Sequence, residues 1–216
     1  MNIFKIILNI LFPEQCSCCK TFGVKLCSVC ARKLQQEFFP AKYSMPSGTL
    51  NREIELVSAF IYRDTAAVLI KNFKFANFRT CSQILASFIK RALEIYTNLN
   101  FDIITFVPMH NIKKQNLGRD HAEDIAKALS KELKIPIANV LVKNKNNLVQ
   151  KRLSLVDRTL NVKNAFETVL DVSDLNIALV DDICTTGITL TECAQQILNM
   201  GALNVTCVSF AKVLKI

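Results

Sequence analysis

The hydrophobic residues of this chain follow two alternating patterns. Short, almost uninterrupted apolar runs predict strands that are buried on both faces of a sheet. Between these runs, apolar residues recur every three to four positions, which predicts amphipathic helices. The predicted strands cover residues 55–63, 101–107, 139–142, 177–180 and 203–212, and the predicted helices cover residues 66–76, 81–96, 120–133 and 190–200. Strands and helices in repeated order predict an α/β fold with a parallel sheet covered by helices.

Four cysteines near the N-terminus stand in two pairs. Cys16 and Cys19 form one Cys-x-x-Cys pair, and Cys27 and Cys30 form a second pair shortly after it. Two such pairs supply four thiolates at the spacing of a tetrahedral zinc site, and a site closed by four thiolates is structural. Cys18 leaves one alternative open, because it could replace a neighbour as a ligand.

The chain is expected to divide after this cysteine module. A short helix is predicted over residues 31–39, and residues 40–51, which are rich in Pro, Ser and Gly, read as a linker. We therefore predict a small module at residues 1–45 and a larger domain at residues 51–216. The first twelve residues are apolar but too short to span a bilayer. We interpret them as a helix docking the module, with interfacial membrane contact as the alternative.

Charge and cysteine usage narrow the partners and the compartment. The chain has 27 Lys and Arg residues against 18 Asp and Glu, a net charge of +9 and a pI near 9.2. This balance favours anionic partners such as phosphates, nucleic acid or acidic surfaces. The odd number of nine cysteines fits a reducing compartment, so a cytoplasmic location is expected. No integral membrane span is predicted.

Two carboxylates follow the apolar run at residues 177–180. Asp181 and Asp182 lie where this strand is expected to give way to a loop, and in open α/β sheets ligands bind outside the carboxyl ends of strands. The loop leads into a predicted helix, whose first N–H groups and nearby hydroxyls can bind an anion. Its residues are Cys184, Thr185, Thr186, Gly187, Ile188 and Thr189.

A ligand carrying both a phosphate and a diol satisfies this pattern, and a 5-phosphorylated ribose is such a ligand. Its hydroxyls would donate to the acids and its phosphate would accept from the N–H groups. The stretch lacks the Gly-Lys-Ser/Thr of a Walker A loop, and its single glycine excludes a dinucleotide fingerprint. It resembles the phosphoribosyl pyrophosphate (PRPP) motif of type I phosphoribosyltransferases, which implies that fold for the larger domain. The alternative is a strand with two solvated acids followed by a Thr-rich helix cap.

Further candidates belong to the pyrophosphate end of such a ligand. In type I phosphoribosyltransferases the loop after the second predicted strand binds pyrophosphate, and here this loop begins Pro108, Met109, His110. His121, near the start of the next helix, could face the loop or act as a surface or capping residue. Residues 143–158 carry five bases and one acid, as expected of a lid over pyrophosphate or of a solvated excursion. The candidates for this loop and lid are His110, Lys113, Lys114, Arg119, Gln150 and Arg158.

A basic, aromatic stretch at residues 71–79 is a candidate for contact with nucleic acid. Lys71, Lys74 and Arg79 alternate with phenylalanines, and interleaved bases and rings can clamp a single strand. The alternative is that the rings pack in the core while the charges stay solvated. We favour core packing for the rings and leave the role of the charges open.

Taken together, the chain resembles the ComF family of competence proteins, in which a four-cysteine zinc module precedes a phosphoribosyltransferase domain. Besides the motifs above, the resemblance depends on the series Gln150, Arg158, Asn161, Ala165 and Phe166. It implies binding of PRPP with Mg²⁺ and a role in the uptake of single-stranded DNA during natural transformation, together with other competence proteins. One position departs from the family pattern: Leu117 stands where an arginine is usual, so a pyrophosphate contact is lost unless Arg119 replaces it.

Two functions follow from this resemblance. The first is a PRPP-binding protein that supports the handling of single-stranded DNA. The alternative is an active phosphoribosyltransferase acting on an unidentified nitrogen nucleophile, with Asp181 and Asp182 as its catalytic acids. In that reaction positive charge develops at the anomeric carbon, and the acids would stabilise it. Because of Leu117, the sequence favours binding over turnover.

Overall fold

The structure is a computed structural model, and it describes residues 13–46, 53–75, 79–143 and 166–214. Its helices are α2 (Ser28–Glu37), α3 (Asp64–Phe75), α4 (Arg79–Tyr96), α5 (Asn111–Leu117), α6 (His121–Leu133) and α8 (Ile188–Asn199). Its strands are β1 (Ala41–Pro46), β2 (Glu53–Ile61), β3 (Ile103–Phe106), β4 (Leu141–Lys143), β5 (Phe166–Thr168), β6 (Asn176–Cys184) and β7 (Asn204–Lys212). The predicted strands and helices are therefore present, with their ends shifted by a few residues.

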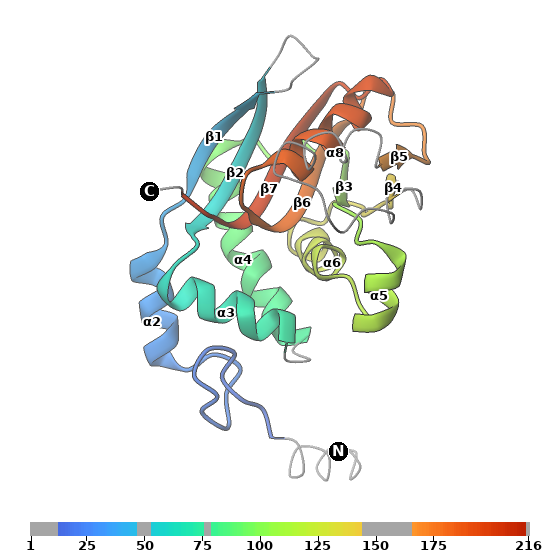
Figure 1. The fold of residues 1–216 in the computed structure, drawn as a ribbon. Helices are drawn as coiled ribbons and strands as arrows, with labels where there is room; N and C mark the ends of the chain where they lie inside the picture. The colour runs from blue at the N-terminus through green and yellow to red at the C-terminus, as the bar shows by residue number, and fades with distance from the viewer. Residues whose placement is uncertain (1–12, 47–52, 76–78, 144–165, 215–216) are drawn as a thin grey trace.

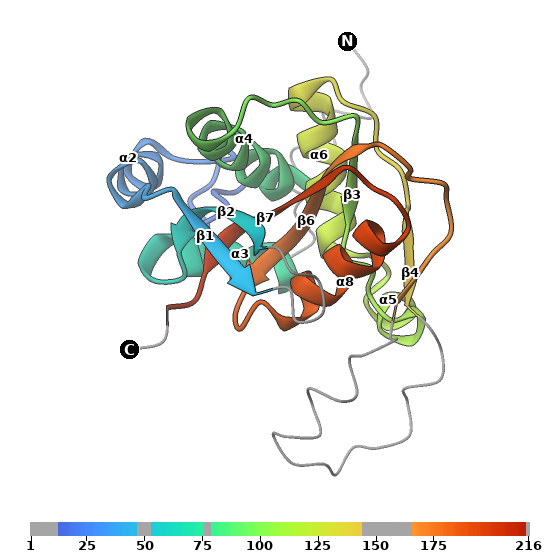
Figure 2. The same ribbon diagram turned by 90° about the horizontal axis from the view of Figure 1, so that it is seen from above.

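Five of the strands form one mixed sheet in the order β1-β2-β7-β6-β3. Strands β2, β7, β6 and β3 run parallel, whereas β1 pairs antiparallel with β2 at the edge. Helices α4 and α6 cover one face and α8 covers the other, as the view along the sheet shows (Figure 2). Strands β4 and β5 make a separate two-stranded ribbon beside α8 (Figure 1). The α/β sheet predicted from the repeated order is confirmed.

The central strand β6 explains why its sequence is a continuous apolar run. Ile177 and Leu179 belong to the core on the α8 side, whereas Ala178 and Val180 belong to the core on the side of α4 and α6. Since successive side chains of a strand point to opposite faces, a strand covered on both sides needs apolar residues at every position.

Strand β1 corrects the prediction of a linker over residues 40–51. Residues 41–46 pair with β2, from Ala41 opposite Ser58 to Pro46 opposite Glu53. Pro40, Ser44 and Pro46 lie before or within this strand, whereas Ser47 and Gly48 lie outside the described part. The division into residues 1–45 and 51–216 stays a prediction.

The cysteine module packs against α3 at one end of the molecule (Figure 1). The carboxylate of Glu37 in α2 accepts hydrogen bonds from the N–H groups of Thr65 and Ala66, at 3.2 and 3.1 Å, and so satisfies free donors at the start of α3. The side-chain amide of Asn72 donates to the carbonyls of Ser17 and Cys18, at 2.8 and 3.0 Å. The module therefore touches α3 near both of its ends.

Two predictions about the N-terminal half have mixed outcomes. Within the described ranges, no helix is both long enough and apolar enough to cross a bilayer, while the apolar residues 1–12 lie outside those ranges.

Phe73 is fully buried, as expected of a core ring, but Phe75 is 86% exposed. The sequence cannot distinguish these two rings by type, and their positions on α3 point them to different sides.

Candidate functional site

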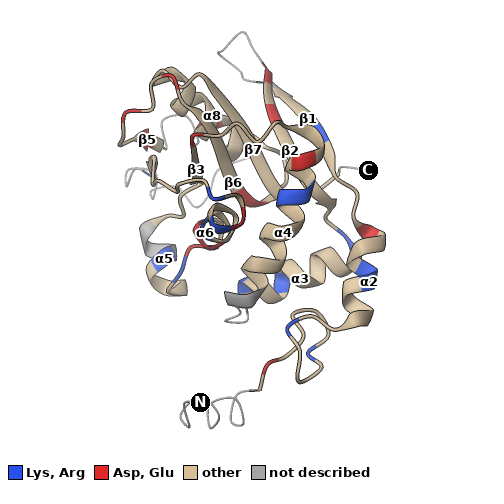
Figure 3. Cartoon of the chain, turned by 180° about the vertical axis from the view of Figure 1, so that it is seen from behind, with Lys and Arg blue, Asp and Glu red and all other residues tan. Residues whose placement is uncertain are grey.

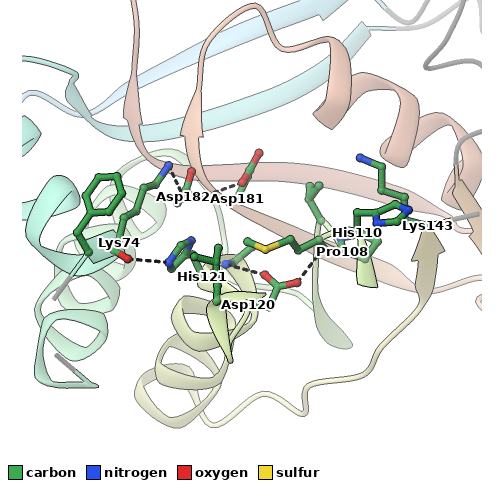
Figure 4. A pocket seen from close by; sticks show the side chains of 13 residues that line it. Lys74, Pro108, His110, Asp120, His121, Lys143, Asp181 and Asp182 are labelled. Atoms are coloured by element: carbon green, nitrogen blue, oxygen red, sulfur yellow. Dashed lines mark hydrogen bonds and ion pairs between the residues drawn. The ribbon is translucent and has the colours of Figure 1, made fainter. Parts of the chain in front are cut away.

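A cavity of about 390 Å³ opens at the carboxyl ends of β3 and β6 (Figure 4). Its lining comes from α3, α5, α6, β4, β6 and the turn after β3. The lining residues are Lys74, Phe75, Val107, Pro108, Met109, His110, Leu117, Asp120, His121, Ala122, Lys143, Asp181 and Asp182. This is the edge of an open α/β sheet at which ligands are expected to bind.

The two predicted acids lie within β6, because this strand continues to Cys184. It still pairs with β7 beyond them, with Asp181 opposite Ser209, but its pairing with β3 ends at Val180. The acids are therefore held by one neighbour strand and open to the cavity on the side where β3 has ended. The prediction that the strand ends at the acids is therefore wrong, because β6 extends two residues beyond Asp182.

The environment of the acid pair favours retention of a proton. The N–H of Asp182 donates to the Asp181 carboxylate at 2.8 Å, yet burial and the nearby charge of Asp182 raise the pKa of Asp181 to about 7. A carboxyl group with this pKa is protonated in part of the molecules and ionised in the rest at neutral pH. The pair can therefore accept hydrogen bonds from sugar hydroxyls in one state and donate one in the other.

Lys74 makes an ion pair with the second acid. Its ammonium lies 2.8 Å from the Asp182 carboxylate, and the two side chains are 29% and 13% exposed. Figure 4 shows Lys74 reaching this acid from α3, on the opposite side of the cavity from Lys143. The sequence placed Lys74 among nucleic-acid candidates, and the structure places it in the cavity.

Asp120 organises the turn after β3. It is 3% exposed, and one of its carboxylate oxygens accepts the N–H of Met109 at 2.8 Å. The other oxygen accepts the N–H groups of Ala122 and Glu123 and so caps α6. Sequence reasoning missed this residue as part of the site, although an aspartate just before a helix is a recognisable cap.

The two histidines both line the cavity. His121 is 6% exposed, its Nε2 lies 3.3 Å from the carbonyl oxygen of Lys74, and its ring packs against Phe73. Burial, followed by the charge of Arg119, lowers the pKa of His121, so the ring is neutral at pH 7. His121 thus faces the cavity, as the sequence analysis allowed. His110 follows Pro108 in the turn, as predicted for the pyrophosphate loop.

The Thr-rich loop follows the acids but does not line this cavity. Thr185 and Thr186 are exposed, Cys184 is buried, and Gly187 precedes α8 as its N-cap with a φ of 84°, a conformation that favours glycine. Ile188 and Thr189 form the first turn of α8. Lys212, which the sequence analysis missed, donates to the carbonyl of Thr185 at 2.7 Å. The acids and the loop are therefore contiguous in the chain, but only the acids line the cavity.

The predicted pyrophosphate cations are mostly engaged elsewhere. Lys114 lies 2.6 Å from Glu123, and this contact raises the pKa of Lys114. Arg119 donates to the carbonyl of Phe73 and pairs with Asp124, both at 3.0 Å. Neither residue is among those lining the cavity. The side chain of Lys113, and all of Gln150 and Arg158, lie outside the described part.

Lys71, another nucleic-acid candidate, does not line the cavity with Lys74. Lys71 is exposed on α3, and the side chain of Arg79 lies outside the described part. Arg91 of α4 donates to Gln35 and packs over the ring of Phe38. Charged residues of both signs are spread over the described helices and strand ends (Figure 3).

The four paired cysteines meet as predicted. The sulfur atoms of Cys16, Cys19, Cys27 and Cys30 all lie within 4.8 Å of one another. Backbone N–H groups point at this cluster: those of Cys27 and Cys30 donate to sulfur atoms at 3.4 and 3.5 Å. Four thiols with such donors fit a structural zinc ion.

Cys18 is not one of the four converging thiols, although it lies beside Cys30. Burial raises the pKa of Cys18 to about 12. In contrast, hydrogen bonds with Thr21 lower the pKa of Cys19 to about 6 and favour its thiolate. Because the four paired sulfur atoms converge without Cys18, the alternative of Cys18 as a replacement ligand is disfavoured.

The strand order, the acids at the open end of β6 and the Thr-Thr-Gly-Ile-Thr turn into α8 together define the type I phosphoribosyltransferase class of fold. Among solved structures, the glutamine PRPP amidotransferase of B. subtilis is 19% identical with a TM-score of 0.42, covering 65% of this chain and 27% of that one. Adenine phosphoribosyltransferase from Thermoanaerobacter pseudethanolicus is 15% identical with a TM-score of 0.41, covering 84% and 99%.

The curated relatives are named as a competence protein and as DNA utilization proteins. Competence protein F of Haemophilus influenzae is 32% identical over 148 residues, which is 65% of this chain and 65% of that protein, slightly less than two thirds. DNA utilization protein YhgH is 28% identical in Salmonella typhimurium and in Escherichia coli K12, covering 83% and 82% of this chain and 87% and 86% of those proteins. No protein-family model matches. The chain is a homologue of competence protein F and YhgH, as its resemblance to the ComF family predicted.

Proposed function

We propose that the protein binds PRPP with Mg²⁺ at the acid pair and acts in the handling of single-stranded DNA. The observation that supports PRPP as the ligand is the position of Asp181 and Asp182. These acids face a cavity at the strand ends, and the turn into α8 follows them in the chain. The relatives' names, competence protein F and DNA utilization protein, support the wider role.

The acid pair would bind the ribose. Asp181 and Asp182 present carboxylate oxygens to the hydroxyls, while N–H groups at the start of α8 would bind the 5-phosphate. Carboxylates beside an incoming diphosphate are also suitable ligands for Mg²⁺, which prefers oxygen donors. When bound, Mg²⁺ neutralises part of the diphosphate charge. His110, which lines the cavity in the turn after β3, would face the diphosphate.

Binding is favoured over transfer by the residues around the diphosphate. Leu117 lines the cavity where the family has an arginine, and Arg119 is held by Phe73 and Asp124. A transferase needs strong neutralisation of the leaving pyrophosphate. If transfer nevertheless occurs, incubation with PRPP and a mixture of nucleobases releases pyrophosphate at a rate that depends on protein concentration.

The N-terminal module would hold one structural zinc ion through Cys16, Cys19, Cys27 and Cys30. The proposed compartment is the reducing cytoplasm, which the odd number of nine cysteines favours. The proposal that DNA and other competence proteins are partners rests on the homology alone. For DNA, the test is a salt series, because affinity for a single strand falls steeply with salt when several phosphates are contacted.

Calorimetric titration with PRPP in excess Mg²⁺ tests the ligand. The double variant Asp181→Asn with Asp182→Asn is expected to lose detectable binding, because it lacks the charged acceptors. The matched control is Asp171→Asn, whose exposed carboxylate bonds only to Ser173 among the hydrogen bonds seen for it. Unchanged affinity in the double variant would refute the site.

A further inference from the structure

A diphosphate in this cavity needs a nearby cation. Asp120, Asp181 and Asp182 all line the cavity and would repel an anion. Of the described residues, two lysines share this lining, Lys74 and Lys143. Lys143 also lies over the Phe166 ring, 5.3 Å from its centre. Lys74 is the lysine that touches the acid pair.

The backbone of Lys74 is fixed, but its ammonium has a choice of partners. Phe73, the residue before it, is fully buried, and His121 contacts the Lys74 carbonyl. The flexible stem then carries the charge to Asp182, where it is partly exposed. A lysine ammonium is a compact charge with three donors, so it can transfer to a neighbouring phosphate oxygen without a change in the helix.

We propose that Lys74 is a diphosphate-binding residue of this site. Its ammonium neutralises Asp182 before the ligand binds, and it moves to the diphosphate when ribose hydroxyls or Mg²⁺ engage that carboxylate. The exchange leaves each carboxylate and phosphate next to a positive or donating group in both states. Lys74 thereby supplies the charge that is absent at Leu117. This inference rests on the proposed binding of PRPP.

Lys71 provides a matched control on the same helix. It lies about one turn before Lys74, is exposed, and is not among the residues lining the cavity. A Lys71→Gln variant removes the same charge from α3 with nearly the same helix propensity. It therefore separates a local contact with the ligand from a general change in the charge of the protein.

The experiment measures the calorimetric affinity of four proteins for three ligands in excess Mg²⁺. The proteins are the wild type, Lys74→Gln, Lys74→Arg and Lys71→Gln, and the ligands are PRPP, inorganic pyrophosphate and ribose 5-phosphate. Lys74→Gln is expected to weaken PRPP and pyrophosphate about tenfold or more, because a charge-assisted hydrogen bond is lost. Its affinity for ribose 5-phosphate should change less than twofold. Lys74→Arg should restore most of the loss, and Lys71→Gln should behave as the wild type.

Two results overturn the inference while the proposed function stands. In the first, wild type and Lys74→Gln bind PRPP equally. In the second, Lys74→Gln lowers the affinity for PRPP and for ribose 5-phosphate by the same factor. Lys74 would then act only by positioning the acid pair and would not contact the diphosphate. If the wild type binds none of the three ligands, the proposed function itself fails, and the role of Lys74 fails with it.

Discussion

The four thiols of the module come from residues 16–30, whereas the acidic cavity draws its lining from residues as far apart as 74 and 182. The first site is assembled by local chain reversal, and its four thiols could hold a metal ion. The second is assembled by the topology of the sheet and helices. This difference teaches that a local site is lost by removing one ligand, whereas a distributed site is altered gradually by changes in its supports.

Replacing a zinc ligand is expected to have the largest effect. Cys19→Ser removes an exposed thiol of the cluster without disturbing the core, and structural zinc contributes about 10–16 kcal/mol in small zinc-binding peptides. The number of zinc ions bound per protein should fall well below one, and thermal unfolding should begin at a lower temperature than in the wild type. Cys18→Ser is the control and should keep its zinc. Loss of zinc in that control alone would assign the ligand to Cys18.

The acid pair should make stability depend on pH. Because the pKa of Asp181 is raised from 3.8 to about 7, the folded protein holds a proton that the unfolded chain releases above pH 4. The contribution of Asp181 therefore falls as pH rises from about 4 to 7 and then levels off. Asp181→Asn should be more stable than the wild type above pH 7, by on the order of 1–3 kcal/mol.

Urea unfolding of both proteins at several pH values checks this. The difference between the two curves isolates Asp181 from His121, whose pKa is lowered by burial and which changes stability in the opposite direction. A difference that stays constant from pH 4 to 8 would contradict the raised pKa.

Asp120→Ala should weaken the support of the distributed site. The change removes the cap of α6 and leaves the N–H of Met109 without its acceptor, which is expected to cost about 1–3 kcal/mol. PRPP affinity should fall as well, since the turn after β3 loses its anchor. Denaturant unfolding and calorimetry measure the two effects. Asp171→Ala, at an exposed carboxylate, should leave PRPP affinity unchanged.

Gly187→Ala should have the smallest effect. Its φ of 84° disfavours any residue with a Cβ, at about 1–2 kcal/mol, and the new Cβ would lie 2.9 Å from the sulfur of Met45. A cycle with Met45→Ala separates the backbone cost from this contact, because the contact term disappears in the double variant. If the cycle shows no coupling in unfolding free energy, the close approach of Met45 has no energetic role.

The sequence predicted what is contiguous in the chain. The Cys-x-x-Cys spacing predicted the four cysteines that converge, and the apolar run followed by Asp181 and Asp182 predicted one side of the cavity. It could not predict that α3 brings Lys74 to Asp182, because that contact joins residues over a hundred positions apart and depends on packing. Asp120 and Lys212 were missed for a related reason: a helix cap and a strand-end lysine acquire a role only from their neighbours.

Local signals also misled at two places. Pro and Ser near residue 46 indicated a linker, yet residues 41–46 pair at the sheet edge, where proline is tolerated because one side of the strand needs no partner. Arg119 lies two residues from Leu117, and sequence distance suggested that it could substitute. In the structure Arg119 contacts Phe73 and Asp124 instead.

The edge position of β1 has a practical consequence for dissecting this protein. A cut near residue 45 would expose the backbone N–H and C=O groups of β2 that now pair with β1, and a bare sheet edge invites self-association. The same cut would take away the carboxylate of Glu37 from the start of α3 and Leu34 from the shared core. The fragment left behind would therefore be prone to aggregate, so the two regions are better separated by point substitutions than by truncation.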